Sequence, residues 1–167
     1  MLRWAVLDQT GPVAIRYPRG GNGKYVDAAW DAEAPAVMHK AGNDCAIITY
    51  GTLVNNAMAA AEHLEEQGIH ASVIRLTSVK PLPVDVLAQM LSGVKHILVL
   101  EETCDGSGVY ESLAWQLGQQ LPDCKFSHID LGQQFVTHGA MDALYKKYGL
   151  DAESVAMHIQ EVLKVEN

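Results

Sequence analysis

The 167-residue sequence lacks the patterns typical of disulfide-rich, zinc-binding and membrane-spanning proteins. Its three cysteines, Cys45, Cys104 and Cys124, lie far apart and form no CxxC pair. An odd, scattered set of this kind favours reduced thiols over a disulfide framework or a zinc site. No apolar run approaches the roughly 20 residues that span a bilayer, and the first residues do not form a signal peptide. We therefore expect a cytoplasmic protein with no membrane partner.

Basic residues are also few, since 12 lysines and arginines stand against 20 aspartates and glutamates. The formal net charge of −8 opposes binding to nucleic-acid phosphates, so no nucleic-acid partner is expected. The sequence has no HExxH, GxSxG or Walker motif, and no GxGxxG follows the first predicted strand. The last absence argues against a small dinucleotide-binding domain. No set of residues in the chain predicts a self-sufficient catalytic site.

Strand-like and helix-like segments alternate from residue 44 onward. Short apolar, β-branched runs predict strands, and apolar residues at helical spacing predict helices. Strands are predicted at 45–50, 71–76, 96–100 and 125–131, and helices between 52 and 68 and at 84–91, 109–121, 140–148 and 152–163. Connections of this length give a mostly parallel sheet with helices on both faces. We therefore predict a three-layer α/β/α domain over residues 44–167, in which Leu113, Trp115 and Leu117 of the helix at 109–121 are available for packing.

The first 43 residues do not follow this alternation. Residues 2–7 predict the end of a helix and 12–15 a short strand, and two such pieces cannot bury a core of their own. Residues 27–35 are acidic and alanine-rich, as in a connector. We therefore predict that 1–26 is the tail of a preceding domain and 27–43 a linker and lead-in. The missing N-terminal domains of the same chain are then its expected partners.

The stretch RYPRGG is the sharpest local signal in the sequence. Pro18 fixes its own backbone, and the glycines that follow permit a tight turn. Arg16 and Arg19, held by such a turn, have the chemistry to bind a phosphate group through paired hydrogen bonds. The alternative is a solvated basic turn or an interdomain salt bridge, because surface charges are usually solvated.

Two glutamates and two histidines are weaker candidates. Glu101 and Glu102 follow a buried strand directly, where ligands of α/β sheets often bind, but they could instead flank the next helix. The glycines at 106–108 resemble a phosphate loop only superficially. His128 in a strand and His138 in a turn have no ligand spacing around them, so packed or exposed histidines are favoured over functional ones.

Four segments, read in order, resemble the C-terminal part of 1-deoxy-D-xylulose-5-phosphate synthases. GPVAIRYPRGG resembles the close of the pyrimidine-binding domain in that family. CAIITYGTLVNNAMAAAEHLEEQGIHASVIRLTSVKPLP, ILVLEETCDGSG and FVTHGAMDALYKKYGLDAESV are similar to successive parts of its last domain. That domain type also occurs in transketolases and in the β subunits of 2-oxoacid dehydrogenases, and RYPRG favours the synthases.

The resemblance implies an enzyme that condenses pyruvate with glyceraldehyde 3-phosphate and releases CO₂, for isoprenoid and thiamine synthesis. It further implies thiamine diphosphate and Mg²⁺ as cofactors, a homodimer, and an acceptor-phosphate contact from the second arginine of RYPRG, which is Arg19. Arg16 is the lesser binding candidate. The family's GDG segment and activating glutamate lie upstream of this chain, so the chain alone is expected to bind no cofactor and to be inactive.

Two departures from the family pattern leave other functions open. Pro83 stands where the family usually has an acidic residue, and ETCDGSG has fewer glycines than is common. A transketolase or 2-oxoacid dehydrogenase relative remains an alternative. A stand-alone assembly module that kept the fold and lost the chemistry is another.

Overall fold

The computed structural model describes residues 2–15, 21, 23–25 and 34–165. Arg16 and Arg19 lie outside the described residues. The strands are β1 Ala36–Lys40, β2 Cys45–Tyr50, β3 Ala71–Leu76, β4 His96–Leu100 and β5 Lys125–Ile129. The helices are α1 Leu2–Leu7, the 3-10 turn η1 Gly51–Leu53, α2 Val54–Glu65, α3 Val84–Met90, α4 Tyr110–Gln120, α5 Met141–Tyr148 and α6 Ala152–Val165.

The five strands form one sheet in the order β1-β3-β2-β4-β5. The β2 strand lies at its centre and pairs in parallel with β3 on one side and β4 on the other, while β5 continues the parallel set. The edge strand β1 runs antiparallel to β3. The sheet is therefore mixed and mostly parallel, which confirms the predicted fold class.

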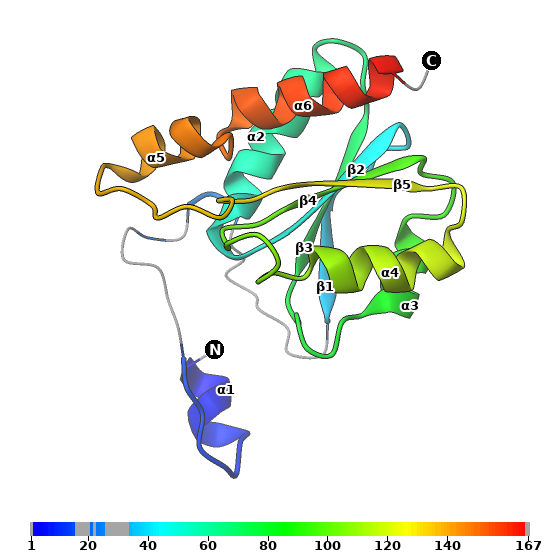
Figure 1. The fold of residues 1–167 in the computed structure, drawn as a ribbon. Coiled ribbons are helices and arrows are strands. Elements are labelled where there is room, and N and C mark those ends of the chain that lie inside the picture. The colour runs from blue at the N-terminus through cyan, green and yellow to red at the C-terminus, as the bar shows by residue number, and fades with distance from the viewer. Residues whose placement is uncertain (1, 16–20, 22, 26–33, 166–167) are drawn as a thin grey trace.

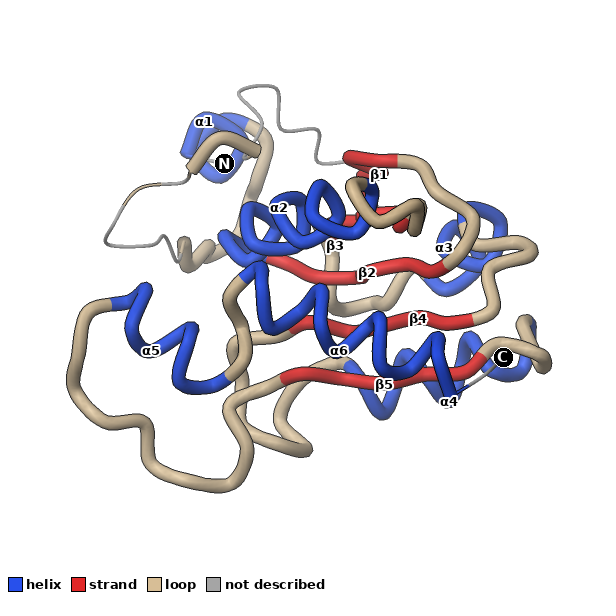
Figure 2. The backbone as a smooth tube through the Cα atoms, turned by 90° about the horizontal axis from the view of Figure 1, so that it is seen from above, coloured by secondary structure: helices blue, strands red, loops and turns tan. Residues whose placement is uncertain are grey.

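Helices cover both faces of the sheet and give it two apolar cores. Figures 1 and 2 show α2 and α6 on one face and α3 and α4 on the other. Successive residues of β2 point to opposite faces: Ile47 belongs to the core under α2 and α6, and Ile48 to the core under α3 and α4. Burial on both faces explains why β2 and β4 are continuous apolar runs without alternation.

The predicted strands at 45–50, 71–76 and 96–100 are confirmed at both ends. The fourth ends at Ile129 and not at 131, because the Asp130 carboxylate accepts a hydrogen bond from the Gly132 amide at 2.8 Å and turns the chain. The strand predicted at 12–15 is wrong, since the structure describes these residues and assigns them to no strand. The sequence predicted no strand at β1, which lies within the segment assigned to a linker. The domain boundaries themselves stay a prediction.

Of the three residues predicted to pack in the helix at 109–121, Leu113 and Leu117 are buried, whereas the prediction for Trp115 is wrong because the residue is 74% exposed. In α4 the buried residues are Leu113 and Leu117, which are four apart and share one face of the helix. Trp115 lies two residues from each and therefore points to the opposite side. No helix in the described part of the chain is both long and apolar enough to cross a membrane.

Candidate functional site at the carboxyl edge of the sheet

Polar and ionisable side chains gather where β2, β4 and β5 end. Tyr50 closes β2, Glu101 and Glu102 follow β4, and Asp130 follows β5. Because these strands are parallel, their carboxyl ends lie at one edge of the sheet. Ligands of open α/β sheets bind beyond this edge. It is therefore the candidate site, and its contacts show what it can do.

The Glu101 carboxylate is buried at this edge, with only 2% of the residue exposed. It accepts hydrogen bonds from the Tyr50 hydroxyl at 3.0 Å, the Val109 amide at 2.9 Å and the Tyr110 amide at 3.2 Å. Gly108 packs so closely that a Cβ there would collide with the carboxylate. Glu101 therefore fixes the loop after β4 onto the first residues of α4, where a negative charge suits the helix dipole.

These contacts decide between the two readings of Glu101. The amides that begin α4, which would have to bind a phosphate, already donate to Glu101, so the glycines at 106–108 do not form a phosphate loop. Burial and then the nearby Glu101 charge raise the pKa of Tyr50 to about 12. Tyr50 therefore stays protonated and acts as a hydrogen-bond donor. The helix-flanking interpretation of Glu101 is confirmed.

Glu102 links the same edge to α5. Its carboxylate accepts a hydrogen bond from the Tyr145 hydroxyl at 3.3 Å. Burial, followed by the Glu102 charge, raises the pKa of Tyr145. The Glu102 side chain is exposed, so this contact orients α5 without forming an enclosed catalytic pair.

The residues just after RYPRGG are anchored on α2. The Tyr25 amide donates to the Asn55 side-chain oxygen at 3.1 Å, and the Tyr25 hydroxyl donates to Glu62 at 2.9 Å. A Cβ at Gly23 would collide with Asn55. Since α2 begins directly after β2 and η1, this anchor lies beside the carboxyl edge. The phosphate-binding role of Arg16 and Arg19 stays a prediction, because both lie outside the described residues.

Three potential metal ligands meet around the end of β5. Asp105, His128 and Asp130 each place one ligand atom within 4.8 Å of the others. The His128 ring stacks on Tyr110, with centroids 4.2 Å apart and planes at 26°. By contrast, His138 is exposed in the turn before α5, and its role stays a prediction. Sequence reasoning missed this group, although a histidine and an aspartate two apart in a strand share one face.

A second polar group lies on the opposite face, under α6, and was also missed. The Ser127 hydroxyl is 2.8 Å from Nε2 of His96 and 3.1 Å from Nε2 of His158. Burial, and then the proximity of His96, lower the pKa of His158. The three residues join β4, β5 and α6, so the network ties the last helix to the sheet. A serine and a histidine inside otherwise apolar stripes were the available signal.

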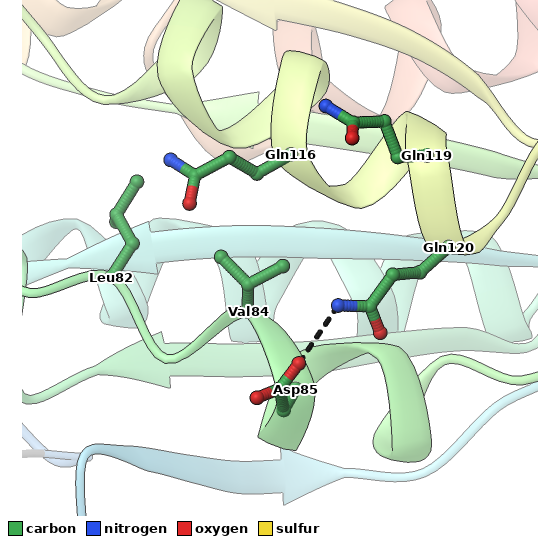
Figure 3. Close-up of a pocket in the computed structure, with 6 residues that line it drawn as sticks. All are labelled: Leu82, Val84, Asp85, Gln116, Gln119 and Gln120. Atoms are coloured by element: carbon green, nitrogen blue, oxygen red, sulfur yellow. Dashed lines mark hydrogen bonds between the residues drawn. The ribbon is translucent and has the colours of Figure 1, made fainter.

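A hollow lies between the start of α3 and the end of α4, and no residue of these groups lines it (Figure 3). It has a volume of about 350 Å³ and is lined by Leu82, Val84, Asp85, Gln116, Gln119 and Gln120. Asp85 accepts a hydrogen bond from the Gln120 amide at 2.8 Å. Asp85 is the one ionisable residue in this lining, so the hollow offers no paired acid and base.

Comparison with known families identifies the family to which this domain belongs. Residues 34–155 match the family model described as "Transketolase, C-terminal domain". The chain is also similar to curated 1-deoxy-D-xylulose-5-phosphate synthases. It is 35% identical to that of Chlorobium phaeovibrioides over 163 residues and 35% identical to that of Chlorobaculum tepidum over 170. These alignments cover 96% and 98% of this chain and 26% of each relative, so the chain spans about a quarter of the relatives' length.

Solved structures agree on the fold. A split gene transketolase, described as an inactive beta4 tetramer, has a TM-score of 0.69 at 26% identity, covering 79% of this chain and 42% of that one. A mutant transketolase from Pichia stipitis has a TM-score of 0.59 at 21% identity, covering 78% and 18%. At 21% identity the second likeness shows the fold alone.

Proposed function

The chain belongs to the transketolase C-terminal domain family, and from this we propose that it is the C-terminal part of a 1-deoxy-D-xylulose-5-phosphate synthase. The whole enzyme would join pyruvate to glyceraldehyde 3-phosphate with loss of CO₂, supplying isoprenoid and thiamine synthesis. The observation that carries this proposal is the alignment of nearly the whole chain with about a quarter of relatives bearing that name, at 35% identity.

The proposed cofactors are thiamine diphosphate and Mg²⁺, bound by upstream parts of the whole protein. The start of α4 does not fit the diphosphate. The amides at the start of α4, which could otherwise bind an anion, donate their hydrogen bonds to the Glu101 carboxylate. No step of the reaction is therefore assigned to these residues.

The role that we propose for this chain is packing against the preceding domains and against a second copy in a cytoplasmic homodimer. Two features support it. Helix α1 buries none of its residues, with Leu2 70% and Val6 69% exposed. Near α5, Phe135 is 100% exposed. Apolar side chains grouped at two such places suit contact with further protein. The free cysteines suit a reducing compartment.

Product formation tests the proposed function directly. The intact protein that contains this chain is incubated with pyruvate, glyceraldehyde 3-phosphate, thiamine diphosphate and Mg²⁺, beside the 167-residue chain. We expect deoxyxylulose phosphate from the intact protein and none from the chain. An intact protein that transfers ketol groups between sugar phosphates instead would establish a transketolase. Activity of the chain alone would contradict the proposal.

Arg19 is proposed to contact the phosphate of the aldehyde acceptor, and Arg16 to support it. Loss of one charged hydrogen-bond pair costs roughly 1.5–3 kcal/mol. Arg19→Ala in the intact enzyme should therefore raise the KM for glyceraldehyde 3-phosphate by about 10- to 100-fold, on the same principle, and leave the KM for pyruvate unchanged. Lys95→Ala, at an exposed position just before β4 and at the opposite edge of the sheet, is the matched control. Equal aldehyde KM values in the two variants would remove the phosphate role.

A further inference from the structure

The loop after β4 and the loop after β5 bring three metal-binding side chains together. His128 lies in β5, which ends at Ile129, and Asp130 is the first residue after the strand. Asp105 comes from the other loop. The three ligand atoms lie within 4.8 Å of one another, and Nε2 of His128 is 3.8 Å from Oδ2 of Asp130.

Contacts outside the group hold each side chain in place. The His128 ring is stacked on Tyr110. Asp130 uses Oδ1 to accept from the Gly132 amide at 2.8 Å, which leaves Oδ2 on the His128 side. Asp105 uses Oδ2 to accept from the Gln133 amide at 2.8 Å, which leaves Oδ1 available. Each aspartate thus keeps one carboxylate oxygen for a ligand.

The two loops are also joined through their backbones. The Glu101 amide donates to the Ile129 carbonyl at 3.1 Å, Leu131 donates to Thr103 at 2.9 Å, and Asp105 donates to Gly132 at 3.3 Å. The pairing of β4 with β5 therefore continues past the sheet as far as the three side chains. Ligands supported in this way need little reorganisation to bind an ion.

The charge of the group favours a cation. Two carboxylates face each other, and in the described part of the chain neither Asp105 nor Asp130 forms an ion pair with a lysine or arginine. Asp130 has an ion-pair contact with His128, which is charged only when protonated. Like charges at this separation repel, and a divalent cation between them removes the repulsion.

The donor set selects the kind of ion. One imidazole nitrogen with two carboxylate oxygens is the ligand chemistry of Zn²⁺, Co²⁺ and Ni²⁺, whereas Mg²⁺ prefers oxygen and water alone. Ligand bonds of about 2.0–2.2 Å place neighbouring donors of a tetrahedral site roughly 3.3–3.6 Å apart, so shifts of about 1 Å would close the group around an ion. We propose that Asp105, His128 and Asp130 bind one divalent transition-metal ion, with solvent completing its coordination. This site is separate from the Mg²⁺ of the proposed enzyme and does not depend on that proposal.

Cobalt titration of the 167-residue chain tests the site, because bound Co²⁺ absorbs visible light according to its ligands. We expect saturable absorption at one ion per chain, abolished by equimolar Zn²⁺. His128→Asn and Asp105→Asn should each weaken Co²⁺ binding by about 10-fold or more, since even supporting contacts are worth that much. The matched control is His63→Asn at an exposed position of α2, which should bind as the unchanged chain does.

Cys104 is the main alternative ligand for the Co²⁺ ion, because its thiol is exposed and the residue adjoins Asp105. Cys104→Ser should leave the titration unchanged. Each variant is first shown by circular dichroism to melt like the unchanged chain, so that lost binding reports a lost ligand. Binding that survives His128→Asn, or that disappears with Cys104→Ser alone, would overturn the proposal, as would Co²⁺ binding too weak to saturate.

Discussion

Helices α1 and α2 are both rich in apolar residues, yet one buries none and the other buries six. In α1, LRWAVL leaves Leu7 65% exposed, whereas α2 packs Leu64 fully into the core shared with β2, β3 and α6. Figure 1 shows α1 apart from the sheet and α2 lying against it. Six residues are too few for a helix to be stable by propensity alone. The proposed preceding domain would account for this difference, because it would cover the apolar side chains that α1 leaves exposed.

The largest effect should come from removing a buried side chain of α2. Leu64→Ala deletes apolar volume from a packed core, which should lower the free energy of unfolding by about 3–4 kcal/mol. Leu7→Ala, the same change in α1, should stay within about 0.5 kcal/mol because its site is exposed. Urea denaturation of the chain measures both. Equal losses in the two variants would mean that α1 is packed after all.

Helix α4 allows a second test, because its start is held by a single carboxylate. Glu101→Ala leaves the Tyr50 hydroxyl and two amides without their acceptor, at a cost of about 2–3 kcal/mol. Glu102→Ala, at the exposed neighbouring glutamate, is the control and should cost well under half as much. If both variants unfold at the same urea concentration, Glu101 does not stabilise α4 as described.

A smaller effect is expected from acidification, through the attachment of α6. The pKa of His158 is below its ordinary value of 6.5 in the folded chain, chiefly because of burial. The unfolded chain then binds more protons, so stability is present above pH 6.5 and is lost as the pH falls through the folded pKa. His96 and His128 oppose protonation, and Glu161 favours it. Unfolding measured across this range should show a positive slope with pH.

Two histidine replacements, one a test and one a control, show whether His158 causes this slope. His158→Asn should flatten the dependence on pH, whereas His63→Asn on the exposed face of α2 should retain it. An unchanged slope in His158→Asn would assign the pH dependence to another group.

The central strands could be predicted to the residue because their signal is local. The runs at 45–50, 71–76 and 96–100 are short, apolar and buried on both faces, and no helix period competes with them. The edge strand β1 escaped prediction because five residues that include His39 and Lys40 have no such run. Its pairing with β3 is a tertiary contact between distant segments.

The candidate site was less predictable for the same reason. The sequence placed Glu101 at the carboxyl edge but could not decide its role, since its partners Tyr50 and Tyr110 come from different elements. The group around His128 needs Asp105 from another loop, and only the pairing of β4 with β5 brings them together. Arg16 and Arg19, identified from the RYPRGG turn and from the resemblance, remain predictions.

Amide hydrogen exchange at α1 tests most directly whether the chain is completed by a preceding domain. Exchange is measured in the 167-residue chain and in the intact protein that contains it. We predict that the amides of Leu2–Leu7 exchange rapidly in the chain and slowly in the intact protein, while those of β2 and β4 are slow in both. Slow exchange at α1 in the chain alone, or rapid exchange at α1 in both proteins, would contradict the account.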